Sequence, residues 1–580
     1  MRRLLYRSNV LSLLCGCWLA LAPGALAAGN VEKPDEPFPS DPREAYDVIA
    51  YRLDLSIDPD QKRLNGKVAI EARCEVKSLS EIVVDLTSDM QVDSVSLLER
   101  DLRGTGSLAG PPLRFEHEGD RLTCTLDSPA AKFDTLRIVI GYSGSPRARD
   151  RFTGFHWKTT AEGEPWIGTS YQLIGAHHWF PCKASFFHPE DKPARIFVNL
   201  DVPDDLVAVS NGRLAQRSSE GDREIFRWFH GYPIPTYSIT LNIAPYVVTE
   251  TPLGLVGLLD PVPFNTFVLP ENEEKAKLQF REVRQMLKIF SEVFGPYPFP
   301  QSKFALVETS FWGMEHSTAV AYGSSYPAWC EANDESDPYA SRNRFFDYIL
   351  VHESAHEWWG NAVSSKDWGD FWIQEGFATY AEGVYVERTK GRSEADRFFE
   401  SQRRSIGKRS RVYSGKDLES AREGYSPSIY TKGAWVLNTL RHYVDNDQLW
   451  WATIRTFYEN YRYGSASTRD FLRTLNRTTG EDWNRFFDEW IYGVGYPNLS
   501  GSVAAKGNEV RLKIDNEGSA KTGFHVPLDL EWYEGERQIR KRIWLDPGSN
   551  DLTLKREMEV SGLSIRNLHR VLGTHEVDVR

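Results

Sequence analysis

Two histidines four residues apart, in His352-Glu353-Ser354-Ala355-His356, constrain this chain more than any other feature. On a helix, side chains four apart lie one turn above each other, so both imidazoles can face one cation. Glu353 borders that face, where its carboxylate can reach a water on the metal without becoming a ligand. The pattern therefore predicts a helix that carries two metal ligands and a general base.

Two histidines leave a tetrahedral zinc short of protein ligands, and Glu375 is the best candidate for the third. Eighteen residues separate it from His356, which leaves room for one helix to end and a second to begin. Three protein ligands leave one position open for water, whose pKa zinc lowers to about 7. We predict one Zn²⁺ per chain on His352, His356 and Glu375, in preference to two structural histidines on an amphipathic helix.

A chain of 580 residues is far longer than one hydrophobic core, so we expect roughly three to four domains. Its formal charge is −12, and −15 without residues 1–27, because that segment holds three arginines and no acid. No basic stripe balances this excess, so a nucleic-acid partner is not expected. The sequence leaves the oligomeric state open.

Residues 1–27 have the three parts of a secretory signal: a basic start, an apolar run and a small-residue cleavage site. These parts are Arg2, Arg3 and Arg7, then Val10 to Ala22, then Ala25-Leu26-Ala27. The apolar run is short for a membrane span of about 20 residues, and Pro23-Gly24 ends it. We therefore predict cleavage, a secreted or periplasmic protein, and no stable membrane span afterwards.

The cysteines add little to this prediction. A lipid anchor at Cys17 is a weaker alternative to cleavage, because it leaves a very short apolar core. Four cysteines would remain in the mature chain, at Cys74, Cys124, Cys182 and Cys330. Their wide spacing resembles neither a zinc knuckle nor a dense disulfide scaffold, so their pairing stays open.

Residues 28–248 are predicted to form an N-terminal antiparallel β domain. Short runs of alternating apolar and polar residues are broken by turn residues, as in Tyr51 to Ile57, Leu136 to Ile140 and Tyr237 to Ile243. This period of two is typical of strands that bury one face.

Residues 249–497 are predicted to form a mostly helical domain with a small β lobe, and this domain carries the metal motif. Helical spacing runs over Glu271 to Phe294, Arg342 to Ala362, Phe371 to Thr389, Ser393 to Ile406 and Ser428 to Val444. Strand patterns interrupt the helices around Phe304 to Val307 and Thr318 to Tyr322. The strand rhythm returns in residues 498–580, which suit a small β-sandwich, so the fold class is multidomain α+β.

Several further motifs occur in a fixed order. They are Gly295-Pro296-Tyr297-Pro298, Gly313-Met314-Glu315, Glu375-Gly376-Phe377-Ala378, Tyr430-x-Lys432-Gly433 and Trp490-Ile491-Tyr492-Gly493. With the histidine motif, they resemble the M1 family of zinc metallopeptidases, the gluzincin aminopeptidases. The resemblance covers most of the mature chain and implies a thermolysin-like catalytic domain.

The resemblance also implies roles for individual residues. Glu353 would act as general base and later proton donor, and Tyr430 would hydrogen-bond the tetrahedral intermediate. Glu315, with Gly313 and Met314 beside it, would bind the free α-amine of the substrate. Gln172 matches the position that forms the other half of this amine pocket.

This chain departs from the family pattern near the amine pocket and in length. His316 stands where the family motif has Asn, His177 or His178 replaces the usual arginine before Phe180-Pro181-Cys182, and Lys183 replaces an acid. Only about 80 residues follow the catalytic domain, in place of a large helical domain that roofs the cleft, so we expect a short form with an open site.

These observations predict a zinc-dependent aminopeptidase acting on peptide substrates. Endopeptidase or epoxide-hydrolase-like activity is the alternative within enzymes, and a silent peptide-binding protein on the same fold is the alternative outside them. Thr379 and Glu382 lie at i+4 and i+7 from Glu375, where either could orient His352 or His356, or face solvent. The preferred N-terminal residue is not encoded in any motif that we recognise.

Overall fold

The structure is a computed structural model that describes residues 41–98, 101–103, 110–149, 153–172, 175–184, 191–323, 326–328, 346–415, 425–518 and 523–580. The predicted signal, Cys17 and Cys330 lie outside these residues. No helix within the described ranges is long and apolar enough to cross a membrane. Cys74, Cys124 and Cys182 are buried and unbridged.

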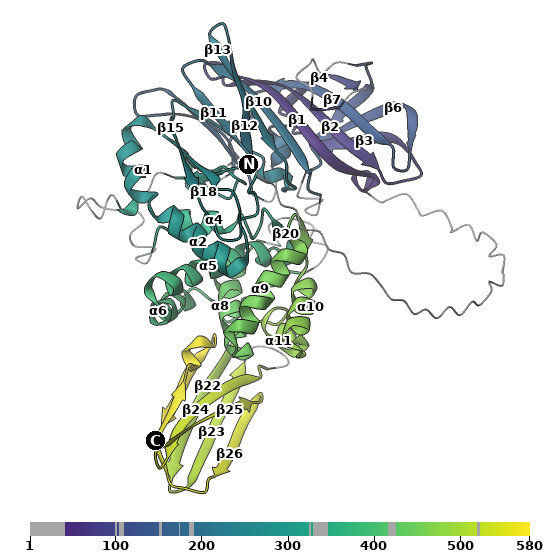
Figure 1. Ribbon diagram of the computed structural model, residues 1–580. Helices are drawn as coiled ribbons and strands as arrows, with labels where there is room; N and C mark the ends of the chain where they lie inside the picture. The colour runs from purple at the N-terminus through teal and green to yellow at the C-terminus, as the bar shows by residue number, and fades with distance from the viewer. Residues whose placement is uncertain are drawn as a thin grey trace, which may run out of the picture. The chain divides into compact units, whose positions relative to one another are not determined.

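The alternating runs of the N-terminal region build a seven-stranded sheet in the order β12-β13-β10-β1-β2-β7-β4 (Figure 1). Its strands are β1 Tyr46–Asp58, β2 Arg63–Cys74, β4 Met90–Leu97, β7 Thr135–Gly144, β10 Arg195–Pro203, β12 Arg213–Glu220 and β13 Arg223–His230. All neighbours are antiparallel except β1 and β10, which pair in parallel with Tyr51 opposite Ile196. The antiparallel prediction therefore holds for this sheet with one exception.

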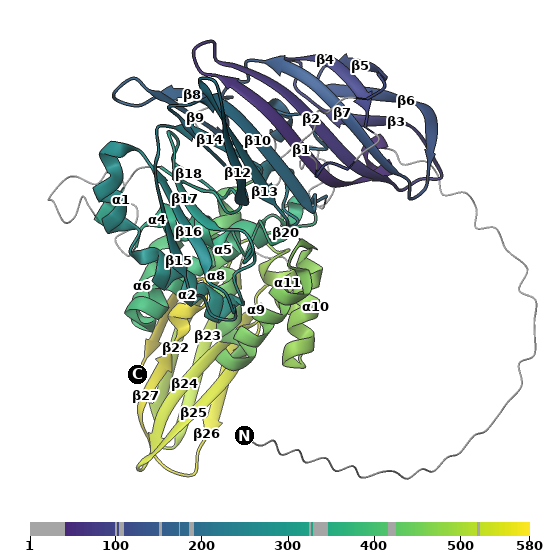
Figure 2. The same ribbon diagram turned by 45° about the horizontal axis from the view of Figure 1, so that its top comes forward.

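Two smaller sheets complete this region. Figure 2 labels β3, β5 and β6 of one sheet and β8, β9 and β14 of the other. They contain β3 Ser78–Asp85, β5 Arg114–Glu118 and β6 Arg121–Ala131 in one, and β8 Gly154–Thr159, β9 Pro165–Ser170, β11 Val207–Ser210 and β14 Leu241–Ala244 in the other. The strand predicted from Tyr237 is wrong at its start. Pro235 fixes an extended backbone, after which Thr236–Ser238 forms a 3₁₀ turn (η3), so the strand begins only at Leu241.

The predicted small β lobe is a five-stranded sheet in the order β15-β16-β17-β19-β18. Its strands are β15 Val247–Leu253, β16 Val262–Val268, β17 Phe304–Glu308, β18 Gly313–Met314 and β19 Val320–Tyr322. The edge strand β18 runs antiparallel to β19, with Gly313 opposite Tyr322. Glu315 therefore follows directly from the edge of this sheet.

Helices dominate the rest of this domain. They are α1 Glu273–Gln279, α2 Glu282–Phe294, α4 Tyr348–Ala355, α5 Trp372–Lys390, α6 Arg392–Arg403, α8 Pro427–Val444, α9 Asp447–Tyr461, α10 Thr468–Thr479 and α11 Asn484–Trp490. The single helix predicted over Glu271 to Phe294 is two helices, separated at Phe280, whose ring packs edge-on against Tyr322 at 5.1 Å. Helix α4 is shorter than predicted, because Asp347 caps its start through the N–H of Leu350 and the chain leaves the helix after Ala355.

The C-terminal residues form two facing β-sheets, as predicted. The first contains β22 Pro497–Lys506, β23 Glu509–Gly518, β26 Gly548–Lys555 and β28 Thr574–Val579, and the second contains β24 Val526–Glu534, β25 Arg537–Leu545 and β27 Val560–Arg566. Between β27 and β28, the 3₁₀ turn η6 (Leu568–Arg570) reaches the helical domain. There, the N–H of Leu572 donates to the hydroxyl of Thr439 at 3.0 Å.

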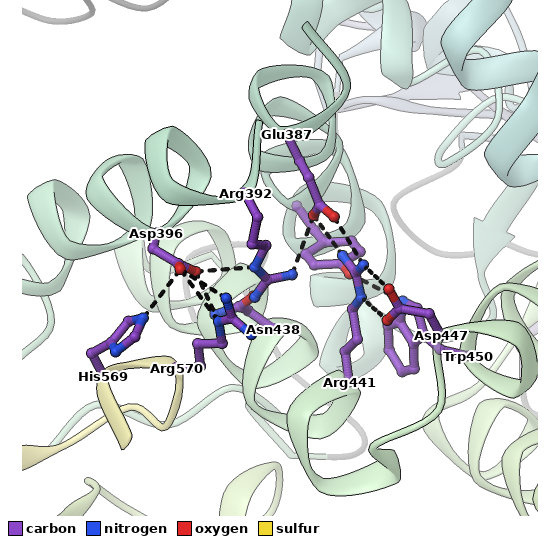
Figure 3. Close-up of polar contacts among 10 residues, drawn as sticks. Glu387, Arg392, Asp396, Asn438, Arg441, Asp447, Trp450, His569 and Arg570 are labelled. Carbon is purple, nitrogen blue, oxygen red and sulfur yellow. Dashed lines mark hydrogen bonds and ion pairs between the residues drawn. The ribbon is translucent and has the colours of Figure 1, made fainter. Parts of the chain in front are cut away.

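A charged network joins this turn to the helices that carry the site (Figure 3). Asp396 on α6 accepts hydrogen bonds from Arg392, His569 and Arg570. Arg441 on α8 makes a two-pronged contact with Glu387 on α5, at 2.6 and 2.9 Å. The same guanidinium also binds Asp447 at the start of α9. The network therefore links α5, α6, α8 and α9 to one another through ion pairs.

Arg441→Met is expected to lower the free energy of unfolding by roughly 2 kcal/mol, because the side chain is only 5% exposed and its loss leaves Glu387 with Arg392 alone, at 3.2 Å, in place of two cationic partners. Urea titration measures this change. The matched control is Arg397→Met, since Arg397 is 62% exposed in a pair with Glu394 and should change stability by less than about 0.5 kcal/mol. Equal effects of the two substitutions would contradict a structural role for the network.

Candidate active site

Three buried side chains converge where α4 meets α5. His352 Nε2 and His356 Nε2 are 3.2 Å apart, and Glu375 Oε2 lies 3.3 and 3.4 Å from them. Burial acts against an ionised carboxylate, but the two imidazoles outweigh it and hold the pKa of Glu375 at about 2. The site therefore presents two nitrogen donors and one charged oxygen to a common point.

The outer nitrogens of both histidines are engaged, which fixes the direction of each ring. His352 Nδ1 lies 2.8 Å from Glu382 Oε1, and His356 Nδ1 lies 2.7 Å from the carbonyl oxygen of Trp359. With a proton kept on each Nδ1, each ring can release its Nε2 proton and offer that lone pair to an ion beside Glu375. Of the two orienting residues considered from the sequence, Glu382 makes this contact, whereas the hydroxyl of Thr379 has no hydrogen-bond partner among the described residues.

Two glycines let α5 and α8 approach closely. A Cβ on Gly376 would lie 3.2 Å from the Cα of Gly433 and 3.0 Å from the carbonyl oxygen of Ile429, so a side chain there would push the two helices apart by a few tenths of an ångström. Gly376 follows Glu375, and Gly433 lies one turn after Tyr430. The close crossing therefore brings Tyr430 beside the metal ligands, with its ring stacked 6.0 Å from that of His352.

Glu353 lies on α4 next to the ligand cluster, against the edge strand β18. A Cβ on Gly313 would come within 3.0 Å of Glu353 Oε1, so glycine leaves the space that this carboxylate occupies. Burial, together with the nearby Glu315 and Glu375 carboxylates, raises the pKa of Glu353 to about 7, although the two imidazoles oppose the shift. A carboxyl with a pKa near neutrality can both take and return a proton.

The hydroxyl of Tyr430 remains a proton donor at any working pH, because burial and then the charge of Glu375 raise its pKa well above the usual value. It donates to the hydroxyl of Tyr425 at 3.0 Å. Tyr425 is 43% exposed and was not among the residues predicted from the sequence. No sequence motif distinguishes Tyr425 from the other aromatic residues of the chain.

Gln172 reaches the cluster from the N-terminal domain. Its Nε2 donates to Glu375 Oε1 at 2.6 Å and to Glu315 Oε1 at 3.4 Å. Glu315 is buried, and its backbone carbonyl accepts from Asn361 Nδ2 at 2.8 Å. Gln172 therefore contacts both Glu315 and the metal ligand Glu375.

The surroundings of Glu315 include residues that the sequence did not single out. Burial raises the pKa of Glu315. A hydrogen bond with Tyr237, which lies in the turn η3, opposes this shift in part. Met314 packs with Tyr237 and Phe311 in a small apolar cluster. His316, which stands at the family Asn position, is fully buried, and its two ring nitrogens have no hydrogen-bond partner in the part of the chain described.

Two family domains match this chain. Residues 47–238 match the Peptidase M1 N-terminal domain, and residues 278–490 match the Peptidase family M1 domain. The chain belongs to peptidase family M1. The second match contains every residue of the ligand cluster, with Glu353, Glu315 and Tyr430, and the first contains Gln172.

This chain is 24% identical to Aminopeptidase M1 of Arabidopsis thaliana over 550 residues, which are 91% of this chain and 59% of the plant protein. It is 24% identical to Aminopeptidase B of Rattus norvegicus over 498 residues, which are 78% of this chain and 70% of the rat protein. The chain therefore spans less than two thirds of the length of the plant relative.

Among solved structures, the M1 zinc metallopeptidase of Deinococcus radiodurans has a TM-score of 0.61 and 22% identity. The match covers 77% of this chain and 93% of the bacterial one. A variant of the bacterial enzyme has been solved with a Tyr-Ser-Ala peptide. At this identity the likeness shows that the two proteins share a fold.

The family implies one Zn²⁺, and the residues of this chain fit it. Donor atoms around a tetrahedral zinc, with bonds of about 2.0 Å, lie about 3.3 Å apart. The three separations here are 3.2, 3.3 and 3.4 Å. Moreover, Glu375 Oε2 is buried without a hydrogen bond from any described residue. His352, His356 and Glu375 are therefore the residues that would hold the ion.

Glu382→Ala is expected to weaken zinc binding by about 10- to 100-fold, because His352 loses the carboxylate that orients its ring. Competition with a chelator of known affinity measures the change. Glu382→Gln keeps an oxygen acceptor and should recover part of the loss. Thr379→Val is the control on the same face of α5, and an equal loss there would show a general disturbance of the helix.

Proposed function

We propose that this M1 peptidase is a zinc-dependent aminopeptidase that removes single residues from the N-terminus of peptides. The observation that supports this most strongly is the contact of Gln172 with both Glu375 and Glu315. It places a buried carboxylate, suited to a protonated amine, immediately beside the metal ligands. A substrate amine bound there leaves the first peptide bond at the metal, which favours exopeptidase over endopeptidase activity.

The side chains divide the chemistry between them. When bound, zinc polarises the scissile carbonyl and makes water a stronger nucleophile. Glu353 takes a proton from the attacking water and returns it to the amide nitrogen as the C–N bond breaks. Tyr430 donates a hydrogen bond to the oxygen on which negative charge develops. Glu315 and Gln172 hold the α-ammonium group, so the bond that breaks is one residue away.

We also propose that the protein acts outside the cytoplasm, in a secreted or periplasmic location. The support is the arrangement of residues 1–27, with a basic start, an apolar run and Ala25-Leu26-Ala27. N-terminal sequencing of the protein purified from its native compartment tests this proposal. A mature chain that begins at Ala28 is expected, whereas a chain that begins at Met1 in the cytoplasmic fraction would contradict it.

Glu315→Gln is expected to lower kcat/KM for aminoacyl chromogenic amides by roughly 10²-fold, because a charge-assisted contact to the ammonium group becomes a neutral one. The panel is run with free and N-acetylated substrates, with and without a chelator. Wild-type protein should cleave only the free substrates, and the chelator should abolish this cleavage.

The matched control for this substitution is Glu308→Gln, which also neutralises a buried carboxylate of the same β lobe. Glu308 lies on β17, where it accepts a hydrogen bond from the N–H of Leu269 at 2.7 Å. This variant should keep the kcat/KM of the wild type. An equal loss in both variants would assign the effect of Glu315→Gln to the fold of the lobe and not to recognition of the amine.

A further inference from the structure

One carboxylate and two imidazoles cluster on the N-terminal domain, and none of them belongs to the zinc site. His177 and His178 come from the 3₁₀ turn η2 (Ala176–His178), and Asp120 from the turn between β5 and β6. The backbone holds both turns: Thr87 N–H donates to the carbonyl of His177 at 2.9 Å. Ser88 N–H donates to Asp120 Oδ1 at 2.8 Å. The second carboxylate oxygen, Oδ2, is left facing His177 Nε2 at 4.0 Å.

Several polar atoms in this cluster have no partner. Nδ1 of His177 and Nδ1 of His178 are buried without a hydrogen bond to any residue in the described ranges. The hydroxyl of Tyr171, whose ring lies 5.8 Å from that of His178, is in the same state. More than about 90% of buried polar groups find a partner, so three orphaned atoms in one place call for an explanation.

Asp120 does not partner the orphaned Nδ1 of His177, because its Oδ2 faces the other ring nitrogen, Nε2. The 4.0 Å between His177 Nε2 and Asp120 Oδ2 is too long for a hydrogen bond. Burial lowers the pKa of His177 to about 4 and that of His178 to about 3, so both rings are neutral at pH 7. Neutral imidazoles carry free lone pairs, which is the form that binds a metal.

We propose that Asp120, His177 and His178 form a second zinc site, separate from the catalytic one. One ligand atom from each residue lies within 4.8 Å of the other two. Asp120 is 50% exposed at its side chain, so it can turn to bring its oxygen to the donor spacing of about 3.3 Å that tetrahedral zinc requires. Two nitrogens and one oxygen suit Zn²⁺ or Co²⁺, whereas Ca²⁺ and Mg²⁺ prefer oxygen ligands throughout.

The residues around the second site determine its affinity for the ion and the segments that the ion would join. Arg149 is 47% exposed and its positive charge acts on both histidines, so binding should be weaker than at the catalytic site. The bound ion would tie the β5–β6 turn to the segment that ends at His178. Gln172 of the amine pocket lies five residues before His177 in the same segment, which turns at Gly175 with a φ of 114°. The second ion would therefore bind close in sequence to a residue of the catalytic site.

The test is a metal count on the full chain, which does not depend on peptidase activity. Protein stripped with a chelator is titrated with Zn²⁺, and bound metal is measured after gel filtration. The wild type is expected to bind two ions per chain. His178→Ala and Asp120→Asn are expected to keep the tight ion and to weaken the second by at least tenfold, whereas His352→Ala should lose the tight ion only. Asp120→Asn retains the acceptor for Ser88 N–H, so it guards against misfolding of the histidine variant.

His117→Ala is the matched control, because His117 lies on the neighbouring strand β5, where its Nε2 contacts the carbonyl of Leu86 instead of the cluster. It should still bind two ions. Co²⁺ loaded into His352→Ala should show the visible bands of four-coordinate cobalt. A wild type that binds one ion, or a second ion that is unaffected by both His178→Ala and Asp120→Asn, would overturn the proposal.

Discussion

Glu353→Gln is expected to lower kcat by roughly 10³-fold and to leave zinc in place. The substitution keeps the size of the side chain but removes the group that exchanges a proton with water and with the leaving amine. The three metal ligands stay intact, because Glu353 lies beside the ligand cluster and not within it. Steady-state kinetics on a free aminoacyl amide, with metal analysis of the same sample, measures both effects.

The control for this experiment is Glu394→Gln, which changes a carboxylate on the outer helix α6 that pairs with Arg397. It should leave both kcat and zinc content unchanged. Loss of zinc from Glu353→Gln would mean that the carboxylate supports the metal centre. Retention of wild-type kcat would show that proton transfer uses another group.

Tyr430→Phe is expected to lower kcat by about 10²- to 10³-fold with little change in KM, because its hydrogen bond forms only as charge grows on the carbonyl oxygen. The phenol stays protonated, since burial and the charge of Glu375 raise its pKa. Tyr425→Phe is the matched control, because Tyr425 contacts the hydroxyl of Tyr430 at 3.0 Å and its loss leaves the proposed donor in place. A larger loss in Tyr425→Phe would show that Tyr425 is the donor.

The local features of the site were predictable from the sequence. The spacing of His352 and His356 follows from the helical period, and the third ligand follows from its distance along the chain. Their separations of 3.2 to 3.4 Å agree with that prediction. The general pattern of strands, helices and strands was also predictable, because each element has its own period of apolar residues.

Features that depend on long-range packing were less accessible. Glu382 and Thr379 were equivalent on the sequence, and only the crossing of α4 and α5 shows that Glu382 meets His352. Tyr237 sits in an alternating run that suggests a strand, yet Pro235 and the following 3₁₀ turn place it near Glu315. Gln172 came from a family resemblance, because no local rule links it to Glu375, 203 residues away.

The most direct test of the proposed activity is to follow a defined peptide by mass spectrometry during incubation with the zinc-loaded protein. An aminopeptidase should remove single residues stepwise from the N-terminus and leave the same peptide uncut after N-acetylation, and Glu353→Gln should not cleave either form. Internal cleavage, or equal cleavage of the acetylated peptide, would contradict it, because Glu315 and Gln172 would then not select a free amine.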